Sequence, residues 1–416
     1  MKILVVYPDQ LFPNTMASHD RVIEMVRCLA LSHEVHVACL LASTDAWSRN
    51  EAGILELGAM PILIEQPFRS YVGRKVAGFA FLLASILTGI ERHYFYTWNP
   101  LISLGLISLL RRESYDAIQV EFCYQATLLR HARPGTLKVI DTIDVLYEKR
   151  TKEARHHHGA MLPWQARRRL AVFKKMELER TALADMIISI SKHDLDVFRE
   201  HLPEHTHLLI PMGRRPTPGV ATKKTEHSPA ILFYGHMGSE QNQAGFWRFW
   251  DRIYPIVVQR MGGVRPPVLV VGTSPPESIC RLHDGTNVTV TGFVQDVRPW
   301  FARAGVLCVP LDLAGGFRGR VLDALAAGIP VVGTHNALDC IAIKDGRHGF
   351  VADADESLAE GLALILRQPD LQARMGAACR ALVNDVYSIE ATYGQLRDFY
   401  RESGSSQPAD KEFALA

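Results

Sequence analysis

Residues 315–332 (GGFRGRVLDALAAGIPVV) contain the pattern with the clearest chemical consequence. Two glycines lead toward a predicted helix, and Arg318 and Arg320 stand at its start. Glycine lets backbone N–H groups approach an anion closely, and a helix N-terminus carries roughly half a positive charge. Gly328 and Pro330 end the helix just before an apolar strand. The stretch therefore predicts a phosphate-binding loop at the start of a helix.

The composition limits what such a loop could serve. The chain has 416 residues, of which 48% are hydrophobic and 22% charged, as in ordinary globular proteins of two or three domains. Lysine and arginine number 46 against 44 aspartates and glutamates, so the net charge is only +2. No overall electrostatic field favours nucleic acid. We expect no nucleic-acid partner, and any basic function must be local.

Cysteine and histidine usage argues against metal sites and disulfides. The seven cysteines are scattered and form no C-x-x-C pair. The run 156–158 is three consecutive histidines, which rarely point at one ion, so we expect no metal there. The N-terminal MKILVVYP is too short an apolar run for a signal peptide and predicts a first buried strand. We expect a cytoplasmic protein with no cleaved leader and no metal.

Strand patterns alternate with helical patterns along most of the chain. A polar, proline-rich stretch at 211–229 interrupts this alternation and is the best candidate for a domain boundary. The pattern predicts an α/β protein with two doubly wound parallel sheets and a ligand crevice at the carboxyl ends of the strands. The predicted strands are 3–7, 34–40, 61–65, 117–121, 137–141, 186–190 and 207–210, then 231–234, 268–271, 288–290, 306–310, 330–333 and 349–352.

Helices predicted in the second half are 243–259, 321–327, 356–367, 371–383 and 389–401. Two segments of the first half could touch a membrane. Residues 76–90 include no charge, but the segment is shorter than the roughly 20 residues that span a bilayer, so a buried helix and an interfacial helix both stay open. Residues 165–175 combine basic and apolar side chains, which suits either anionic lipid or a solvated helix face.

In this context the second half resembles the C-terminal domain of retaining GT-B glycosyltransferases, family 4 (group 1). The resemblance rests on short motifs that stand in the family's order. They are Phe233-Tyr234-Gly235, Asn242, the aromatic run 246–250, Val271-Gly272, Thr291-Gly292-Phe293-Val294, the run 322–332, Asp345-Gly346, Gly349 and Tyr387-Ser388.

The resemblance implies a GT-B fold, in which two Rossmann-like doubly wound domains face each other across a crevice. It places an acceptor-binding domain at 1–212, a nucleotide-sugar donor domain at 213–388, a helix that crosses back at 389–402 and a disordered tail at 403–416. It implies transfer of a sugar, of the hexosyl type, with retention, from a nucleotide-sugar donor to a glycan, glycolipid or lipid-linked acceptor. Such an enzyme would serve surface polysaccharide or glycoconjugate biosynthesis, use no cofactor, and work in the cytoplasm or as a peripheral protein at the inner face of the cell membrane.

Roles for individual residues follow from the same resemblance. Arg318 and Arg320 would neutralise the leaving diphosphate, and Asp323 would bind the ribose. Asp141 and Asp144 either hold an acceptor hydroxyl or cap the next helix. The expected donor-binding residues are Gly235, Asn242, Phe293, Val294, Gly315, Gly316, Phe317, Arg318, Arg320, Val321 and Asp323. The expected catalytic residues are Arg318, Arg320 and Asp144, and those on the acceptor side are His19, Arg21, Asp141 and Asp144.

Several positions depart from the common family pattern. Gly315 stands where many members have a glutamate that contacts the sugar, and Ile143 stands where many have a histidine. His236 and Gln241-Asn242 replace a common Arg and Lys, so phosphate charge must come chiefly from Arg318 and Arg320. Two alternatives therefore stay open: a non-hydrolysing nucleotide-sugar epimerase, and a catalytically degenerate nucleotide- or glycan-binding regulatory protein.

Overall fold

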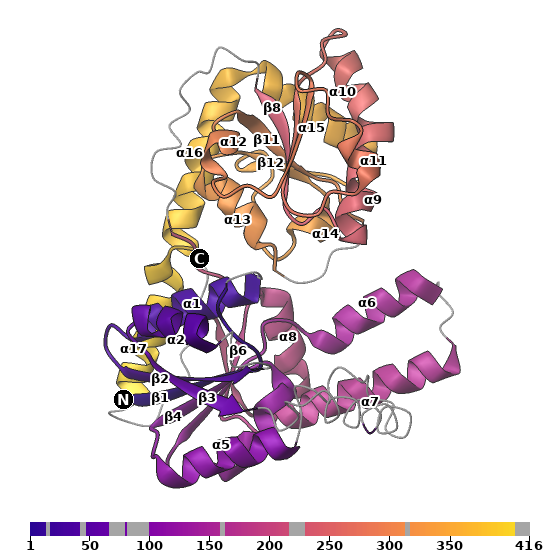
Figure 1. The fold of residues 1–416 in the computed structure, drawn as a ribbon. Helices are drawn as coiled ribbons and strands as arrows, with labels where there is room; N and C mark the ends of the chain where they lie inside the picture. The colour runs from indigo at the N-terminus through magenta and orange to yellow at the C-terminus, as the bar shows by residue number, and fades with distance from the viewer. Residues whose placement is uncertain are drawn as a thin grey trace. The chain divides into compact units, whose positions relative to one another are not determined.

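The computed structural model describes residues 1–13, 17–41, 47–65, 80, 100–158, 163–215, 229–312 and 317–403. The chain divides into two compact units (Figure 1). Unit 1 comprises the described residues of Met1–Gly213 and Thr392–Ala416, and unit 2 is Arg214–Ala391. The last helix of the chain thus belongs to the same unit as the first strand. The segment 76–90 lies outside the described residues apart from position 80.

Unit 1 is built on a seven-stranded parallel sheet in the order β3-β2-β1-β4-β5-β6-β7. Its central strands are runs of apolar residues that are buried on both faces, as parallel sheets require. The side chains of 3–6, for example, are all fully buried. The strands are β1 Lys2–Tyr7, β2 Glu34–Leu41, β3 Met60–Glu65, β4 Ala117–Glu121, β5 Leu137–Asp141, β6 Met186–Ser189 and β7 Thr206–Leu209.

Helices cover both faces of this sheet. Helices α1 and α17 pack together on one face, while α5, η1 and α7 pack into the core on the other (Figure 1). A buried hydrogen bond from Tyr400 Oη to Gln119 Oε1 (2.6 Å) fixes α17 to β4. The helices are α1 Ala17–Leu29, α2 Trp47–Glu56, α5 Pro100–Arg112, η1 Cys123–His131, α6 Leu146–His158, α7 Trp164–Thr181, α8 Lys192–His201 and α17 Gln395–Ser403.

Unit 2 repeats the plan with a six-stranded parallel sheet in the order β10-β9-β8-β11-β12-β13. Its core lies between the sheet and a cluster of aromatic residues that includes Phe233, Phe246 and Phe249. The strands are β8 Ala230–Tyr234, β9 Val268–Val271, β10 Val288–Gly292, β11 Ala304–Val309, β12 Val331–Gly333 and β13 Gly349–Val351.

In unit 2, α9, α10 and α15 cover one face of the sheet, and α13 and α16 pack together on the other (Figure 1). Among the predicted helices, 243–259 is interrupted by a π-helical turn, η2 Phe249–Ile253, just before Pro255, which cannot donate a helical hydrogen bond. The helices are α9 Glu240–Arg248, α10 Tyr254–Arg260, α11 Glu277–Cys280, α12 Arg298–Phe301, α13 Gly319–Ala326, α14 His335–Leu338, α15 Asp355–Arg367, α16 Pro369–Val386 and η3 Glu390–Gly394.

The predicted fold class, two doubly wound parallel sheets, is confirmed.

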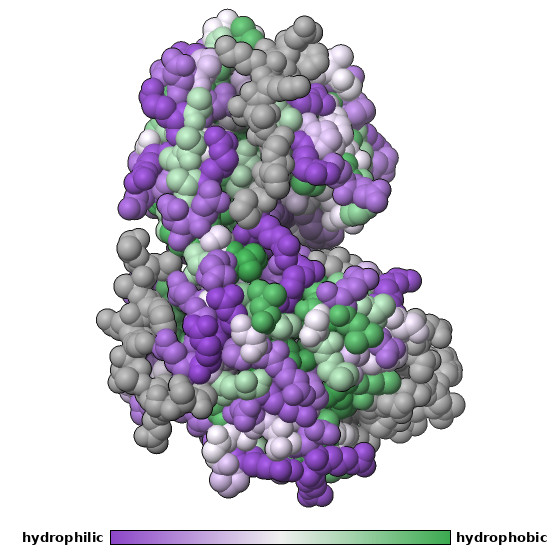
Figure 2. Space-filling view, turned by 90° about the vertical axis from the view of Figure 1, so that its left-hand side faces the viewer, coloured by the Kyte–Doolittle hydropathy of each residue, from purple (hydrophilic) through white to green (hydrophobic). Residues whose placement is uncertain are grey.

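The surface of unit 1 drawn in Figure 2 mixes hydrophilic with hydrophobic residues. None of the described helices combines the length and apolar character that a membrane crossing needs.

A long helical hairpin extends from unit 1, formed by α6 and α7 (Figure 1). The buried carboxylate of Glu177 on α7 accepts the backbone N–H groups of Leu146 (2.9 Å) and Tyr147 (2.7 Å), so it caps the first turn of α6. Burial raises the pKa of Glu177 to about 8. The start of the hairpin therefore depends on a buried acid.

We predict that this acid makes stability depend on pH. A carboxyl whose pKa is raised in the folded state binds its proton more tightly there, so it stabilises the fold at low pH. That contribution should fall by up to about 1.4 kcal/mol per pH unit as the pH rises from about 5 to 8. Glu177→Gln should flatten this slope in urea unfolding, whereas exposed Glu179→Gln should not. Equal slopes in wild type and Glu177→Gln would contradict the prediction.

Candidate active site

The candidate site of unit 2 begins at the carboxyl ends of β8 and β9. Gly235 and Gly272 follow these strands with φ of +137° and +146°. A Cβ on Gly272 would lie 1.7 Å from the Gly235 carbonyl oxygen, and a Cβ on Gly235 would lie 1.6 Å from Nη1 of Arg320. Both glycines are therefore required by close approach as well as by φ. The absence of a side chain at Gly235 leaves room for the Arg320 guanidinium.

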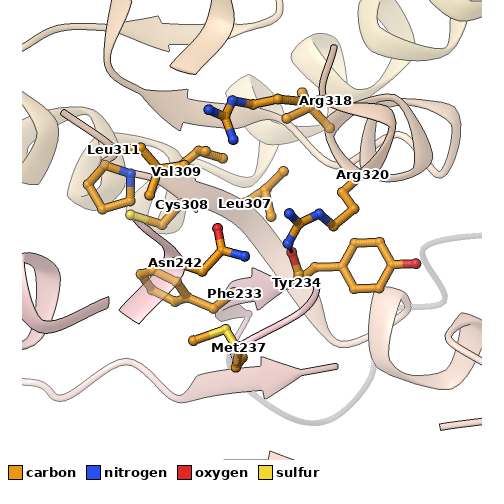
Figure 3. A pocket seen from close by; sticks show the side chains of 12 residues that line it. Phe233, Tyr234, Met237, Asn242, Leu307, Cys308, Val309, Leu311, Arg318 and Arg320 are labelled. Atoms are coloured by element: carbon orange, nitrogen blue, oxygen red, sulfur yellow. Dashed lines mark hydrogen bonds between the residues drawn. The ribbon is translucent and has the colours of Figure 1, made fainter. Parts of the chain in front are cut away.

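A pocket opens beside these glycines, and its lining combines apolar side chains with two arginines (Figure 3). It is formed by the ends of β8 and β11, the start of α9 and the start of α13. Of the described residues that line it, none is acidic. The lining residues are Phe233, Tyr234, Met237, Asn242, Leu307, Cys308, Val309, Pro310, Leu311, Arg318, Arg320 and Val321.

Arg318 is the least compensated charge of this pocket. Its Nε and Nη2 atoms are buried, and neither has a hydrogen-bond partner among the residues that the structure describes. Burial lowers the pKa of the Arg318 guanidinium, yet arginine stays protonated at neutral pH. A buried cation without an acceptor is costly, and an anion in the pocket would remove that cost. Arg318 therefore marks a site for a negatively charged ligand.

Arg320 adds a second positive charge to the same pocket. Its Nη1 donates to the Tyr234 carbonyl oxygen at 3.3 Å, as Figure 3 shows. Burial lowers the pKa of Arg320, and repulsion from Arg318 lowers it further. Both arginines stand at the first turn of α13, where no side chain caps the helix. Two repelling cations and a helix N-terminus suit a ligand with more than one negative charge, such as a diphosphate.

Neighbouring interactions fix the frame of the pocket. Asn242 Nδ2 donates to the His236 carbonyl oxygen at 2.7 Å, and His236 Nδ1 lies 2.8 Å from Thr273 Oγ1. On the opposite side, Arg248 forms ion pairs with Asp355 (2.7 Å) and Asp312 (2.5 Å). Asp312 is three residues before the predicted phosphate loop, which begins at Gly315, so Arg248 fixes the chain just ahead of that loop. Sequence reasoning missed these ion pairs; the signal available was the single arginine inside the aromatic run 246–250.

Other predicted donor-binding residues lie around the pocket or outside the described ranges. Phe317 packs near Tyr387, with ring centroids 6.2 Å apart. Phe293 and Val294 follow β10 and do not line the pocket, and Phe293 is 76% exposed. Gly315 and Gly316 lie outside the described residues.

Asp323 lies on α13 with its Oδ1 2.8 Å from Nε of Arg214. Sequence reasoning did not identify Arg214, and no short-range pattern links it to a residue more than a hundred positions further on.

Three of the four predicted acceptor-side residues of unit 1 are buried, and two of these three contact each other. Arg21 Nε and Nη2 lie 2.8 and 2.7 Å from Asp141 Oδ2, and both side chains are 0% exposed. They form a buried ion pair that supports the sheet edge, and their contact with an acceptor stays a prediction. His19 is also buried, at 2% exposure.

A second carboxylate lies beside this ion pair. Glu121 Oε1 accepts a hydrogen bond from Gln119 Nε2 (2.7 Å), and Glu121 has no solvent exposure. Burial, together with the charge of Asp141, raises the pKa of Glu121 well above its ordinary value. Burial also raises the pKa of Asp141, but its direct contact with Arg21 opposes that rise, so Glu121 has the larger upward shift of the two. Sequence reasoning missed Glu121 because it completes an apolar strand pattern.

Asp144 is the predicted residue that stays accessible. Its side chain is 16% exposed and pairs with Lys149 at 3.2 Å. The preceding Ile143 has φ of +58°, and Phe122 at the end of β4 has φ of +61°. Such conformations are costly for non-glycine residues and concentrate at functional sites. Backbone strain therefore gathers at the carboxyl edge of the unit 1 sheet, next to Asp144.

Residues that could hold a metal are not grouped in the part of the chain that the structure describes, since no three His, Cys, Asp or Glu side chains cluster suitably there. The run 156–158 ends helix α6.

We predict that Gly235→Ala weakens anion binding. The added Cβ must displace the Arg320 guanidinium, whereas Gly262→Ala, with φ of +68° and nothing within 4 Å of its added Cβ, adds backbone strain alone. Titration with inorganic pyrophosphate should show a loss of affinity for Gly235→Ala that Gly262→Ala does not share. Equal affinities in the two variants would disprove the requirement for close approach.

Comparison with known proteins finds similarity in the part of the chain that holds this pocket. Residues 228–368, about a third of the chain, match the family model described as glycosyl transferases group 1. The match covers β8 to α15 and includes all residues that line the pocket. A stretch of 89 residues is 35% identical to D-inositol 3-phosphate glycosyltransferase from Streptomyces scabiei. That alignment covers 21% of this chain and spans only about a fifth (20%) of the relative.

Solved structures match the chain over nearly its whole length. Sucrose-phosphate synthase from Thermosynechococcus elongatus is 15% identical, with 97% of this chain and 99% of that chain covered at a TM-score of 0.68. HepE from Anabaena, solved with UDP and glucose, is 15% identical, with 97% and 100% covered at a TM-score of 0.62. A glycosyltransferase from Rickettsia africae is 13% identical, with 98% and 99% covered at 0.63. At these identities the likeness establishes the fold, which is that of GT-B glycosyltransferases.

Proposed function

We propose that the chain is a glycosyltransferase that moves a sugar from a nucleoside-diphosphate sugar to a glycan, glycolipid or lipid-linked acceptor. The observation that carries this proposal is the pair Arg318 and Arg320 in a pocket whose described lining is free of acidic residues. Two buried nitrogens of Arg318 find no acceptor within that described part of the chain. The family match of 228–368 contains this pocket and supports the same assignment. UDP, which is bound in the HepE structures, is the first nucleotide to test.

In the proposed reaction the protein binds the diphosphate and stabilises its negative charge as the sugar departs. Arg318, Arg320 and the N-terminus of α13 supply that stabilisation, which typically accounts for ~100-fold or more in rate per group. Asp323 accepts ribose hydroxyls, and Phe293 and Val294 lie against the base. Transfer with retention, as proposed for family 4, lets the leaving phosphate take the proton of the acceptor hydroxyl, while Asp144 orients that hydroxyl. No metal or cofactor takes part in this proposal.

The acceptor is proposed to be lipid-linked or part of a surface polysaccharide, reached at the inner face of the cell membrane. Support comes from the hairpin of unit 1: α7 begins with Trp164, which is 63% exposed, and continues with exposed Arg167, Arg168 and Lys175. Trp164, Arg168 and Lys175 recur at helical spacing on one face, opposite the buried Phe173. Indole rings and basic side chains on one helix face suit an anionic membrane surface.

A nucleotide- or glycan-binding protein without turnover is the second candidate. Ile143, which stands where many relatives have a histidine, is almost fully buried and holds a strained backbone conformation. Binding of nucleotide without turnover over a full donor panel would favour this candidate. Conversion of a donor into its epimer in the absence of acceptor would instead favour the epimerase alternative.

We predict opposite effects of Arg318→Met on activity and stability. Removing the cation should lower turnover of the preferred donor by about 100-fold. It should also leave the melting temperature unchanged or raise it, because an uncompensated buried charge is replaced by an apolar side chain. Turnover is measured by release of nucleoside diphosphate from a panel of nucleotide sugars, and stability by thermal unfolding.

Arg281→Met serves as the control, because Arg281 is an exposed arginine of the same unit that pairs with Glu277. Arg320→Ala should reduce turnover without unfolding the protein. Full activity in Arg318→Met and Arg320→Ala would refute the phosphate-binding assignment.

We also predict binding to anionic vesicles that depends on α7. Wild type should float with vesicles containing phosphatidylglycerol at low salt and be released at high salt, because each basic residue contributes about 1 kcal/mol near such a surface. Arg167→Glu with Arg168→Glu should abolish flotation. Arg265→Glu with Arg281→Glu makes the same charge change on exposed arginines of unit 2 and should preserve it. Failure of wild type to float would remove the membrane proposal.

A further inference from the structure

The carboxylate proposed to bind the ribose is itself held by an arginine. Arg214 Nε lies 2.8 Å from Asp323 Oδ1, with 13% and 28% of the two side chains exposed. Arg214 is the first residue of unit 2, and Asp323 lies on α13, the helix that begins with the pocket arginines. This ion pair is partly shielded from solvent, so it is screened less than a surface pair.

The backbone of Arg214 is fixed as firmly as its side chain. Its N–H donates to the Tyr387 carbonyl oxygen at 2.6 Å, and Arg214 forms a parallel bridge with Ser388. The N–H of the preceding residue, Gly213, donates to Tyr393 Oη at 3.1 Å within unit 1. Adjacent peptide groups of one segment are therefore tied into the two different units. Arg214 lies where the chain first passes from unit 1 to unit 2, and Ser388 shortly precedes its return at 391–392.

The chemistry of a carboxylate allows it to serve two partners at once. An ionised aspartate offers about four lone-pair positions on two oxygens, so an ion pair through Oδ1 leaves capacity for a hydroxyl donor. A carboxylate held in one orientation also loses less conformational entropy when a ligand binds. The charge of Asp323 also acts on Arg320: burial and Arg318 lower the pKa of that guanidinium, and Asp323 opposes the lowering. The Asp323 carboxylate therefore acts on two arginines, Arg214 and Arg320, and a change at Arg214 alters its interaction with Arg320.

We infer that Arg214 is a positioning residue for the nucleotide: it orients Asp323 so that the carboxylate accepts the ribose hydroxyls. The inference rests on the proposed function, since it takes a nucleoside diphosphate as the ligand of the pocket. It adds that ribose recognition depends on the segment that joins the two units. A diphosphate without ribose does not use this contact.

Equilibrium titrations with a nucleoside diphosphate and with inorganic pyrophosphate test this inference. UDP is tried first, then GDP and ADP, and the tightest ligand is used. Arg214→Met and Asp323→Asn should each weaken nucleoside diphosphate binding by about tenfold, which corresponds to about 1.4 kcal/mol. Pyrophosphate affinity should change by less than about twofold, and Arg214→Lys should recover part of the loss. Because the residues act through one contact, the double variant should bind no more weakly than either single variant.

Arg215→Met is the matched control, since it removes the same charge from the adjacent residue, and thermal unfolding confirms that each variant is folded. Should Arg214→Met misfold, Arg214→Lys and Asp323→Asn carry the test alone. Unchanged UDP affinity in Arg214→Met, an equal loss for pyrophosphate, or additive losses in the double variant would each overturn the inference. If wild type binds pyrophosphate but no nucleotide, the proposed function fails and the inference fails with it.

Discussion

Unit 2 is organised around two positive charges, Arg318 and Arg320, in a pocket where no described lining residue is acidic. Arg318 is buried with two nitrogens that lack an acceptor among the described residues, and Arg320 repels it from the first turn of the same helix. Such an arrangement opposes folding, because burying an unpaired charge costs free energy that good packing must offset. It persists where the missing partner is supplied by a ligand. The cost in stability is then regained when an anion binds.

The rest of unit 2 can be understood as support for these two side chains. Gly235 and Gly272 lack side chains where any Cβ would clash with Arg320 or with the adjoining strand end. Arg248 fixes Asp312 just ahead of the loop, and Arg214 holds Asp323 on the helix that the arginines begin. In unit 1, by contrast, Arg21 has its own carboxylate, so its charge is satisfied internally. The two sheets share a topology but differ in whether their edge carries an unpaired charge.

Much of this could be predicted from sequence, because the signals are local. Parallel strands that are buried on both faces have apolar residues throughout, so they can be recognised in the sequence. Gly235 and Gly272 directly follow two such strands, β8 and β9. Arg318 and Arg320 precede a helix pattern in the same way. The ion pairs could not be predicted, since Arg21 on α1 and Asp141 at the end of β5 are 120 residues apart and meet only through the tertiary fold. For the same reason the sequence indicated Arg21 and Asp141 as acceptor contacts, whereas their mutual pairing makes them internal.

The most direct test of the central claim is the melting temperature of the wild-type protein with saturating nucleotides. A ligand that binds only the folded state raises it, by an amount that grows with concentration over the dissociation constant. If the pocket arginines bind a diphosphate, UDP, GDP or ADP should raise the melting temperature, and the corresponding nucleoside without phosphate should not. No shift with any diphosphate at millimolar concentration, or an equal shift with the nucleoside, would contradict the account.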